Sequence, residues 1–289
     1  MKLQELNRNV HRLEFDFDYK DLNQHKILIM SDVHWDNPHC DRSLLKKHMD
    51  YALANKIPVF INGDFFCLMQ GKYDPRKRKN NIRPEHNKEN YLDAVISDAV
   101  DWWSPYKDVL TVIGYGNHET SILSHQETDP LQRFVDLFNY TNQSKIYTGG
   151  YGGWFVLKYN YTKGDFGYTY KIKYFHGSGG GGPVTKGTIQ NNRIMTSVSG
   201  ADCFVLGHVH ELYQMYYTVE TLNVRNNVEL KNILHLRAGT YKEEYGDGYM
   251  DYHIERGRPP KPLGCFEMVA DIYKEKNKTI VNTTARALI

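Results

Sequence analysis

The sequence predicts an α/β protein whose strands deliver polar side chains to one edge of the fold. Short apolar runs at 27–30 and 59–61 are typical of buried strands, and each leads directly into an aspartate. A segment with apolar residues at helical spacing, 41–55, lies between them. Because ligands in α/β sheets bind beyond the carboxyl ends of the strands, we expect residues at these ends to converge.

Length and composition are compatible with one large domain. The chain has 289 residues, of which 40% are hydrophobic and 24% charged. No composition break marks a second unit, so we predict a single domain over 1–289. Its core covers about 27–240, a basic loop is inserted at 72–88, and 241–289 hold an irregular segment and closing strands. The formal net charge of +2 argues neither for nor against nucleic acid.

The sequence shows no feature of secretion or membrane insertion. Its four cysteines form no CxxC pair, which favours reduced thiols over a disulfide framework. The first residues contain no apolar stretch typical of a signal peptide, and no run approaches the roughly 18 apolar residues that span a bilayer. We therefore expect a cytoplasmic protein without a membrane partner, of undefined oligomeric state.

The remaining elements follow from apolar patterns along the chain. Alternating residues at 13–17 predict an edge strand, and Pro130 is expected in the first turn of a helix. Residues 70–90, with seven Lys or Arg between 72 and 88, are expected to form a surface loop. Further helical spacing occurs at 89–103, and further strands are predicted at 109–113, 154–159, 168–175, 203–206, 212–219, 228–236, 266–273 and 279–285.

The polar residues that follow the strands are of metal-ligand and acid–base types. They are Asp32, His34, Asp64, Asn117, His118, His176, His208 and His210. In Asp-x-His and His-x-His, both side chains lie on one side of an extended segment. A set of carboxylate, imidazole and amide groups suits Mn, Fe, Zn or Ni better than Ca or Mg.

The order of these motifs resembles that of the calcineurin-like metallophosphoesterases. The shared motifs are Asp32-x-His34, Gly63-Asp64, Gly116-Asn117-His118-Glu119, His176-Gly177 and Gly207-His208-x-His210. The resemblance implies a four-layer α/β/β/α sandwich of two mixed sheets. It also implies two divalent metal ions at the strand ends, for which manganese is our first choice and iron, zinc or nickel are the alternatives.

The resemblance further assigns a role to each residue. Asp32, His34, Asp64 and His210 would hold the first metal ion, and Asp64, Asn117, His176 and His208 the second, so that Asp64 bridges the two. A hydroxide between the ions would attack phosphorus in line. His118, which is not a ligand in this scheme, would act as general acid toward the leaving oxygen.

Three features favour phosphodiesters over phosphomonoesters. These are the second histidine of the 207–210 motif, the absence of the arginine-bearing extension that protein Ser/Thr phosphatases carry after Asp64, and the basic loop. We therefore expect a phosphodiesterase or nuclease acting on DNA, RNA or a nucleotide. Candidate substrate contacts are Arg76, Arg78, Arg83 and, from its position after the first motif, His39.

Alternatives remain open at this level. The enzyme could be a phosphomonoesterase acting on a small molecule or a phosphoprotein, and a metal-bound scaffold without turnover is a third hypothesis. The basic loop could equally be a solvated surface. We interpret Cys67 as a small buried side chain in preference to a ligand, and the glycine run 179–182 as a flexible loop in preference to a phosphate site.

Overall fold

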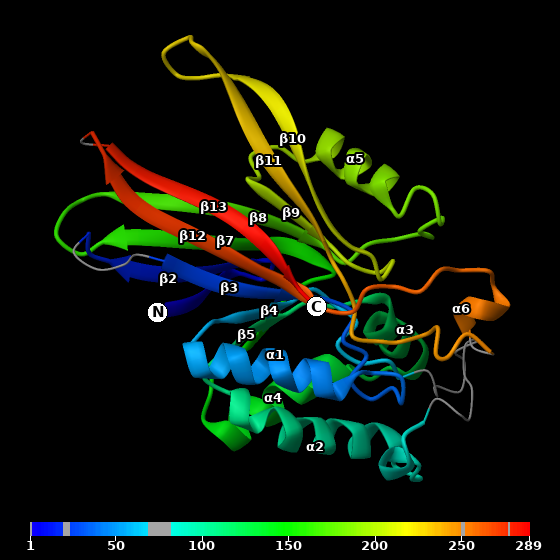
Figure 1. Cartoon of the computed structure of the whole chain (residues 1–289). Helices are drawn as coiled ribbons and strands as arrows, with labels where there is room; N and C mark the ends of the chain where they lie inside the picture. Colours follow the sequence, from blue (N-terminus) through cyan, green and yellow to red (C-terminus); the bar gives the residue numbers. More distant parts are fainter. Residues whose placement is uncertain (1, 20–23, 69–81, 250–251, 277) are drawn as a thin grey trace.

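The chain forms two mixed β-sheets packed face to face, with helices on their outer faces (Figure 1). The computed structural model describes residues 2–19, 24–68, 82–249, 252–276 and 278–289. One sheet has seven strands and the other six. The predicted layered α/β sandwich is confirmed.

The seven-stranded sheet has the order β1-β2-β7-β8-β9-β11-β10. Three pairs are parallel (β2 with β7, β8 with β9, and β9 with β11), and the others are antiparallel. Its strands are β1 (Lys2–Asn7), β2 (Val10–Phe17), β7 (Gly152–Tyr161), β8 (Gly167–Phe175), β9 (Cys203–Leu206), β10 (Leu212–Leu222) and β11 (Val228–Ala238).

The six-stranded sheet has the order β13-β12-β3-β4-β5-β6. Strands β3 to β6 run parallel, and β12 joins them antiparallel to β3. Its strands are β3 (Gln24–Met30), β4 (Val59–Ile61), β5 (Leu110–Ile113), β6 (Tyr147–Thr148), β12 (Cys265–Glu275) and β13 (Lys278–Leu288).

The inner faces of the two sheets share one hydrophobic core. Phe60 of β4 stacks on Phe155 of β7 with a ring centroid separation of 5.1 Å, and Phe15 of β2 lies in the same cluster. The alternation at 13–17 thus marks the inner face of a strand, as predicted. The strand is not at the edge of the sheet, however, because it lies between β7 and β1, and β1 is the edge strand.

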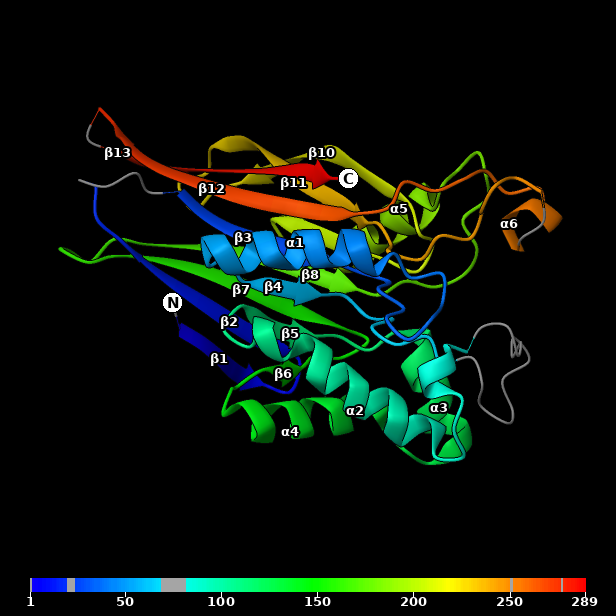
Figure 2. The ribbon, with the colours of Figure 1, turned by 60° about the horizontal axis from the view of Figure 1, so that its bottom comes forward.

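Helices cover the outer face of each sheet. Helices α1 (Arg42–Asn55), α2 (Tyr91–Trp103) and α4 (Pro130–Asn142) pack on the six-stranded sheet (Figure 2). Helix α5 (Thr188–Ser197) places Ile194 and Met195 against Phe204 on the seven-stranded sheet. Two short helices, α3 (Asn117–Gln126) and α6 (Tyr252–Glu255), complete the fold. Among the described helices, none combines the length and hydropathy needed to cross a membrane.

Candidate metal centre

Six strands end at the candidate site, three from each sheet. Strands β3, β4 and β5 lead into the loops of Asp32, Asp64 and Asn117, while β8, β9 and β11 lead into those of His176, His208 and residue 239. The loops are joined through their backbones: the Asp32 amide donates to the Gly63 carbonyl at 3.0 Å, and the His34 amide to the Asp64 carbonyl at 3.0 Å. The strand ends therefore build one shared wall.

Several residues of these loops have a backbone conformation that side chains rarely adopt. Positive φ angles occur at Asp32 (50°), His34 (48°), Asp64 (48°), His208 (71°) and His210 (56°). Non-glycine residues in this region cost free energy, and such strain concentrates at functional sites. All five of these residues belong to two clusters of possible metal ligands.

The first cluster consists of Asp32, His34 and His210, whose donor atoms lie within 4.8 Å of one another. Nε2 of His210 is 3.3 Å from Oδ1 of Asp32 and 3.2 Å from Nε2 of His34. Two imidazole nitrogens and a carboxylate oxygen at this separation direct lone pairs into one space. These residues could hold a metal ion.

The second cluster consists of Asp64, His176 and His208, again with donor atoms within 4.8 Å. Nε2 of His176 is 3.2 Å from Oδ2 of Asp64 and 3.2 Å from Oδ1 of Asn117. Nδ1 of His208 is 2.7 Å from the same Asn117 oxygen. The donors are two nitrogens and two oxygens, which again fits a transition-metal ion.

Asp64 connects the two clusters. Its Oδ2 is 3.2 Å from Nε2 of His176 and 3.8 Å from Nε2 of His34. Gly63, at φ +81°, makes the turn that brings Asp64 here, and a Cβ at that position would lie 2.5 Å from Nδ1 of His176. Only glycine fits at position 63, and the position of the Asp64 carboxylate depends on this turn.

The electrostatics of the clusters favour positive charge. Burial alone raises the pKa of Asp64, but His176 and His118 outweigh it and hold that pKa well below its usual range. Burial likewise lowers the pKa of His176, yet Asp64 and Asp32 outweigh it and raise the pKa to about 10. The same carboxylates that retain a proton on an imidazole would stabilise a bound cation.

His118 lies beside Asp64 and His34, in the first turn of α3. Its backbone amide donates to Oδ1 of Asp64 at 3.0 Å, and its Nδ1 contacts the carbonyl of Cys67. Nε2 is 3.8 Å from Oδ2 of Asp64, and the residue is only 7% exposed. The contact with Cys67 therefore fixes the ring with Nε2 toward the candidate metals.

Glu119 and Asp36 support the loops from behind. The Glu119 carboxylate accepts from the amides of Gly116 at 2.9 Å and Phe66 at 2.8 Å. The Asp36 carboxylate accepts from the amide of Leu68 at 2.9 Å and from the Tyr91 hydroxyl at 3.2 Å. Asp36 thus braces the segment after Asp64.

Two of the four candidate substrate contacts, Arg83 and His39, lie among the described residues. Arg83 donates to the carbonyl of Cys40 at 3.3 Å. His39 is half-buried, and its carbonyl accepts from the Glu243 amide at 2.8 Å. Arg76 and Arg78 lie outside the described residues, as does most of the basic loop. Residues 84–86, at its end, form a 3₁₀ helix that buries His86 against Asp98.

Cys67 is a buried thiol close to the first cluster. It is 2% exposed, its Sγ accepts from Nδ2 of Asn37 at 3.1 Å, and burial raises its pKa to about 12. Its sulfur, with donor atoms of His34 and His118, forms a further group within 4.8 Å. The other three cysteines, like Cys67, are free and buried.

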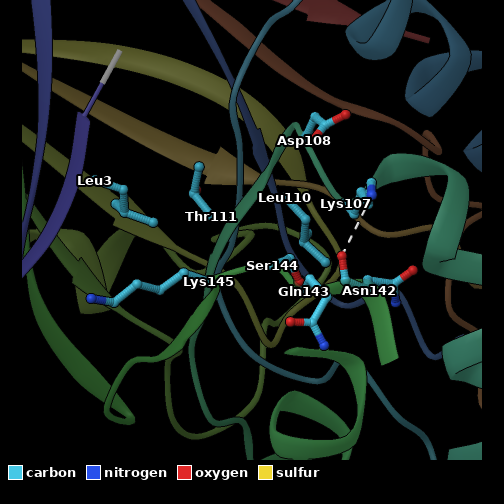
Figure 3. A pocket seen from close by; sticks show the side chains of 9 residues that line it. All are labelled: Leu3, Lys107, Asp108, Leu110, Thr111, Asn142, Gln143, Ser144 and Lys145. Carbon is cyan, nitrogen blue, oxygen red and sulfur yellow. Dashed lines mark hydrogen bonds between the residues drawn. The ribbon is translucent and has the colours of Figure 1, made fainter. Parts of the chain in front are cut away.

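Two cavities lie outside the clusters. One, of about 250 Å³, is at the start of β5 and the end of α4, where the Lys107 ammonium donates to the Asn142 carbonyl at 3.4 Å (Figure 3). The other, of about 450 Å³, lies between α5 and β8, with Ser178 and Arg193 in its lining. Among the described residues, no histidine lines either cavity, so neither matches the chemistry of the clusters.

Sequence patterns gave no indication of Lys242 and Glu244, which also border the first cluster. Nδ1 of His210 is 3.3 Å from Oε2 of Glu244, and the Lys242 ammonium is 2.7 Å from Oε1 of the same carboxylate. Both lie in a segment without apolar periodicity or a motif. Charged residues after a strand do not by themselves predict a contact with a metal ligand, so only the three-dimensional structure reveals this pair.

Comparison with known proteins yields distant structural likeness alone. Vacuolar Protein Sorting 29 from Cryptosporidium parvum aligns with 92% of this chain and 99% of its own, at 13% identity and a TM-score of 0.35. A conserved uncharacterized protein from Streptococcus pneumoniae TIGR4, described as a predicted phosphoesterase, aligns with 92% of this chain and 100% of its own, at 13% identity and a TM-score of 0.31.

GAP50, described as the anchor in the inner membrane complex of Plasmodium, aligns with 92% of this chain and 88% of its own, at 9% identity and a TM-score of 0.43. No protein-family model and no curated protein matches the sequence. At these identities and TM-scores, nothing about this chain's activity follows from the likeness.

Proposed function

We propose that this protein is a dimetal-dependent phosphoester hydrolase of the calcineurin-like type. The observation that carries the proposal is the pair of neighbouring donor clusters joined through Asp64. Each cluster contains residues that the family resemblance assigns to one and the same metal ion. The spatial grouping of these residues supports the proposal.

The first ion would be held by Asp32, His34, Asp64 and His210. The second would be held by Asp64, Asn117, His176 and His208. Bound there, two ions would supply Lewis acidity and lower the pKa of water between them. The mixed nitrogen and oxygen donors keep manganese as first choice, with iron, zinc and nickel as alternatives.

The chain's own residues supply the remaining steps. His118, held through Nδ1 by the Cys67 carbonyl, would carry a proton on Nε2 and pass it to the leaving oxygen. Buried walls around the clusters exclude bulk water, since Asp32, Asp64 and His176 are each at most 2% exposed. Low exposure strengthens every charge interaction made with a phosphoryl group.

A phosphodiester in a nucleic acid or nucleotide is the proposed substrate class. Support comes from the sequence: the second histidine of the 207–210 motif, the missing arginine after Asp64 and the basic loop. Arg83 lends no weight, because its guanidinium contacts a backbone carbonyl. Hydrolysis of phosphomonoesters is the competing activity.

The proposal is tested by paired hydrolysis of bis-p-nitrophenyl phosphate and p-nitrophenyl phosphate with added Mn²⁺. We expect the diester to be cleaved faster, and Asp64→Asn to abolish both activities. Faster cleavage of the monoester would contradict the proposed phosphodiester substrate and would leave the proposed metal-dependent hydrolysis unchanged. Equal activity in Asp64→Asn would refute the role of the shared carboxylate.

A further inference from the structure

The segment that follows β11 forms part of the wall of the first cluster. The Tyr241 amide donates to the Asp32 carbonyl at 3.1 Å, and the Thr240 hydroxyl donates to the same oxygen at 2.8 Å. Further along, the Glu243 amide donates to the His39 carbonyl at 2.8 Å. The segment is therefore fastened to the loop that carries Asp32 and His34.

Glu244 collects three polar partners at the end of this segment. Its carboxylate lies 3.3 Å from Nδ1 of His210, 3.4 Å from Nε2 of His253 and 2.7 Å from the Lys242 ammonium. Its side chain is 11% exposed and that of Lys242 is 7% exposed. A carboxylate buried to this degree, with three polar partners around it, is held in one position.

The contact with His210 determines which nitrogen faces the cluster. A carboxylate accepts only, so Nδ1 must carry the proton that is shared with Glu244. Nε2 is then the nitrogen left to bind a metal ion, and this is the atom that lies 3.3 Å from Asp32 and 3.2 Å from His34. Glu244 thus acts on the cluster through His210 and touches none of the reacting atoms.

We propose that Glu244 is a positioning residue of the first metal site. It fixes the tautomer and ring orientation of His210, while Lys242 balances its charge and holds it in place. The proposal rests on the function proposed above. Removal of such a carboxylate behind a ligating histidine typically weakens metal affinity 10–100-fold.

A purely structural role of Glu244 and Lys242 leads to a different expected result. If Glu244 merely tied the 240–255 segment together, its loss would lower thermal stability and affect both ions alike. If it positions His210, only one ion weakens, because the second cluster contains no contact with Glu244 among the described residues. Excess metal would then restore turnover.

The experiment compares Mn²⁺ binding by the metal-free full chain of the wild type, Glu244→Gln and Glu243→Gln. Glu243 is the matched control, since it is adjacent and half-buried and its carboxylate accepts from the Tyr245 amide. In Glu244→Gln we expect one of two ions to bind roughly 10–100-fold more weakly and the other within about twofold of wild type. Activity in this variant should approach that of the wild type at saturating Mn²⁺.

Unchanged binding in Glu244→Gln, or equal weakening of both ions, overturns the positioning role. If that variant does not fold, the ¹⁵N spectrum of the Zn²⁺-loaded wild type decides. A proton on Nδ1 of His210 with zinc on Nε2 supports the proposal, and the opposite tautomer contradicts it. If the wild type binds no metal, the proposed function is overturned as well. If the wild type binds two ions and Glu244→Gln binds them equally well, only this inference is overturned.

Discussion

His118 and Asp64 are neighbours for which we propose different roles, and substitution can separate the two roles. Because His118 is assigned no metal ion, His118→Ala should retain both ions and lose most turnover, by about 10²–10⁴-fold. Metal content and kcat on the better ester measure the two effects. Full turnover in this variant would remove the general-acid role.

A second residue-scale prediction concerns His235, which is fully buried in β11. Its ring lies 4.7 Å from that of Phe204 and 4.6 Å from that of Tyr217, and neither nitrogen has a hydrogen-bond partner among the described residues. Burial, assisted by Arg237, lowers its pKa to about 4. The folded state therefore holds this imidazole neutral at pH 5.

The sign of the pH effect follows directly. The unfolded imidazole binds a proton near pH 6.5, so between pH 6.5 and 4 the unfolded state takes up more protons. The free energy of unfolding should fall by about 2 kcal/mol more in the wild type than in His235→Phe between pH 7.5 and 5. Parallel pH profiles in urea titrations of the two proteins would contradict the burial argument.

At this scale the sequence offers candidate metal ligands but not the residues that support them. The metal-ligand candidates follow strands in recognisable motifs, whereas Glu244 and Asp36 act through contacts that no spacing encodes. His39 is a candidate because it follows the first motif, and Arg83 because it belongs to the basic loop that follows the second. Such nearness says nothing of where a side chain on a loop is directed, and the Arg83 guanidinium is bound to a carbonyl instead.

Among the elements, the loop before α3 has little room to change. Gly116 approaches Asp64 so closely that an added Cβ would lie 2.0 Å from its Oδ1 and 2.3 Å from its amide nitrogen. Gly116→Ala should therefore displace the shared carboxylate and reduce metal content and turnover at least 10-fold. Gly180→Ala is the control, since a Cβ at Gly180 meets nothing within 4 Å. Wild-type activity in both variants would show that the close approach is unimportant.

The strands were easier to predict than the short or polar elements. Buried runs such as β4 and β9 are apolar throughout, which is the pattern expected of strands covered on both faces. Helix α3 was not predicted because Ile122 is the only one of its apolar residues that is buried. Its available signal was Glu119, which lies three residues after Gly116 and completes a capping arrangement. Strand β1 and helix α5 are mostly polar and gave no periodic signal.

For the whole molecule, the layered architecture explains why distant motifs meet. Parallel strands in both sheets end on the same side, so loops from 31 to 239 share one wall although the sequence separates them widely. The α/β class follows from the alternation of buried runs and amphipathic segments. Strand order does not, because pairings such as β2 with β7 depend on tertiary packing that no local pattern specifies.

The most direct test of the central claim is the state of manganese bound to the full chain. Two Mn²⁺ ions per chain, with an electron paramagnetic resonance spectrum of an exchange-coupled pair, are predicted for the wild type, because Asp64 joins both clusters. In Asp64→Asn the coupling should disappear. A wild type that binds one ion or none, or two ions without coupling, would contradict a shared dimetal centre.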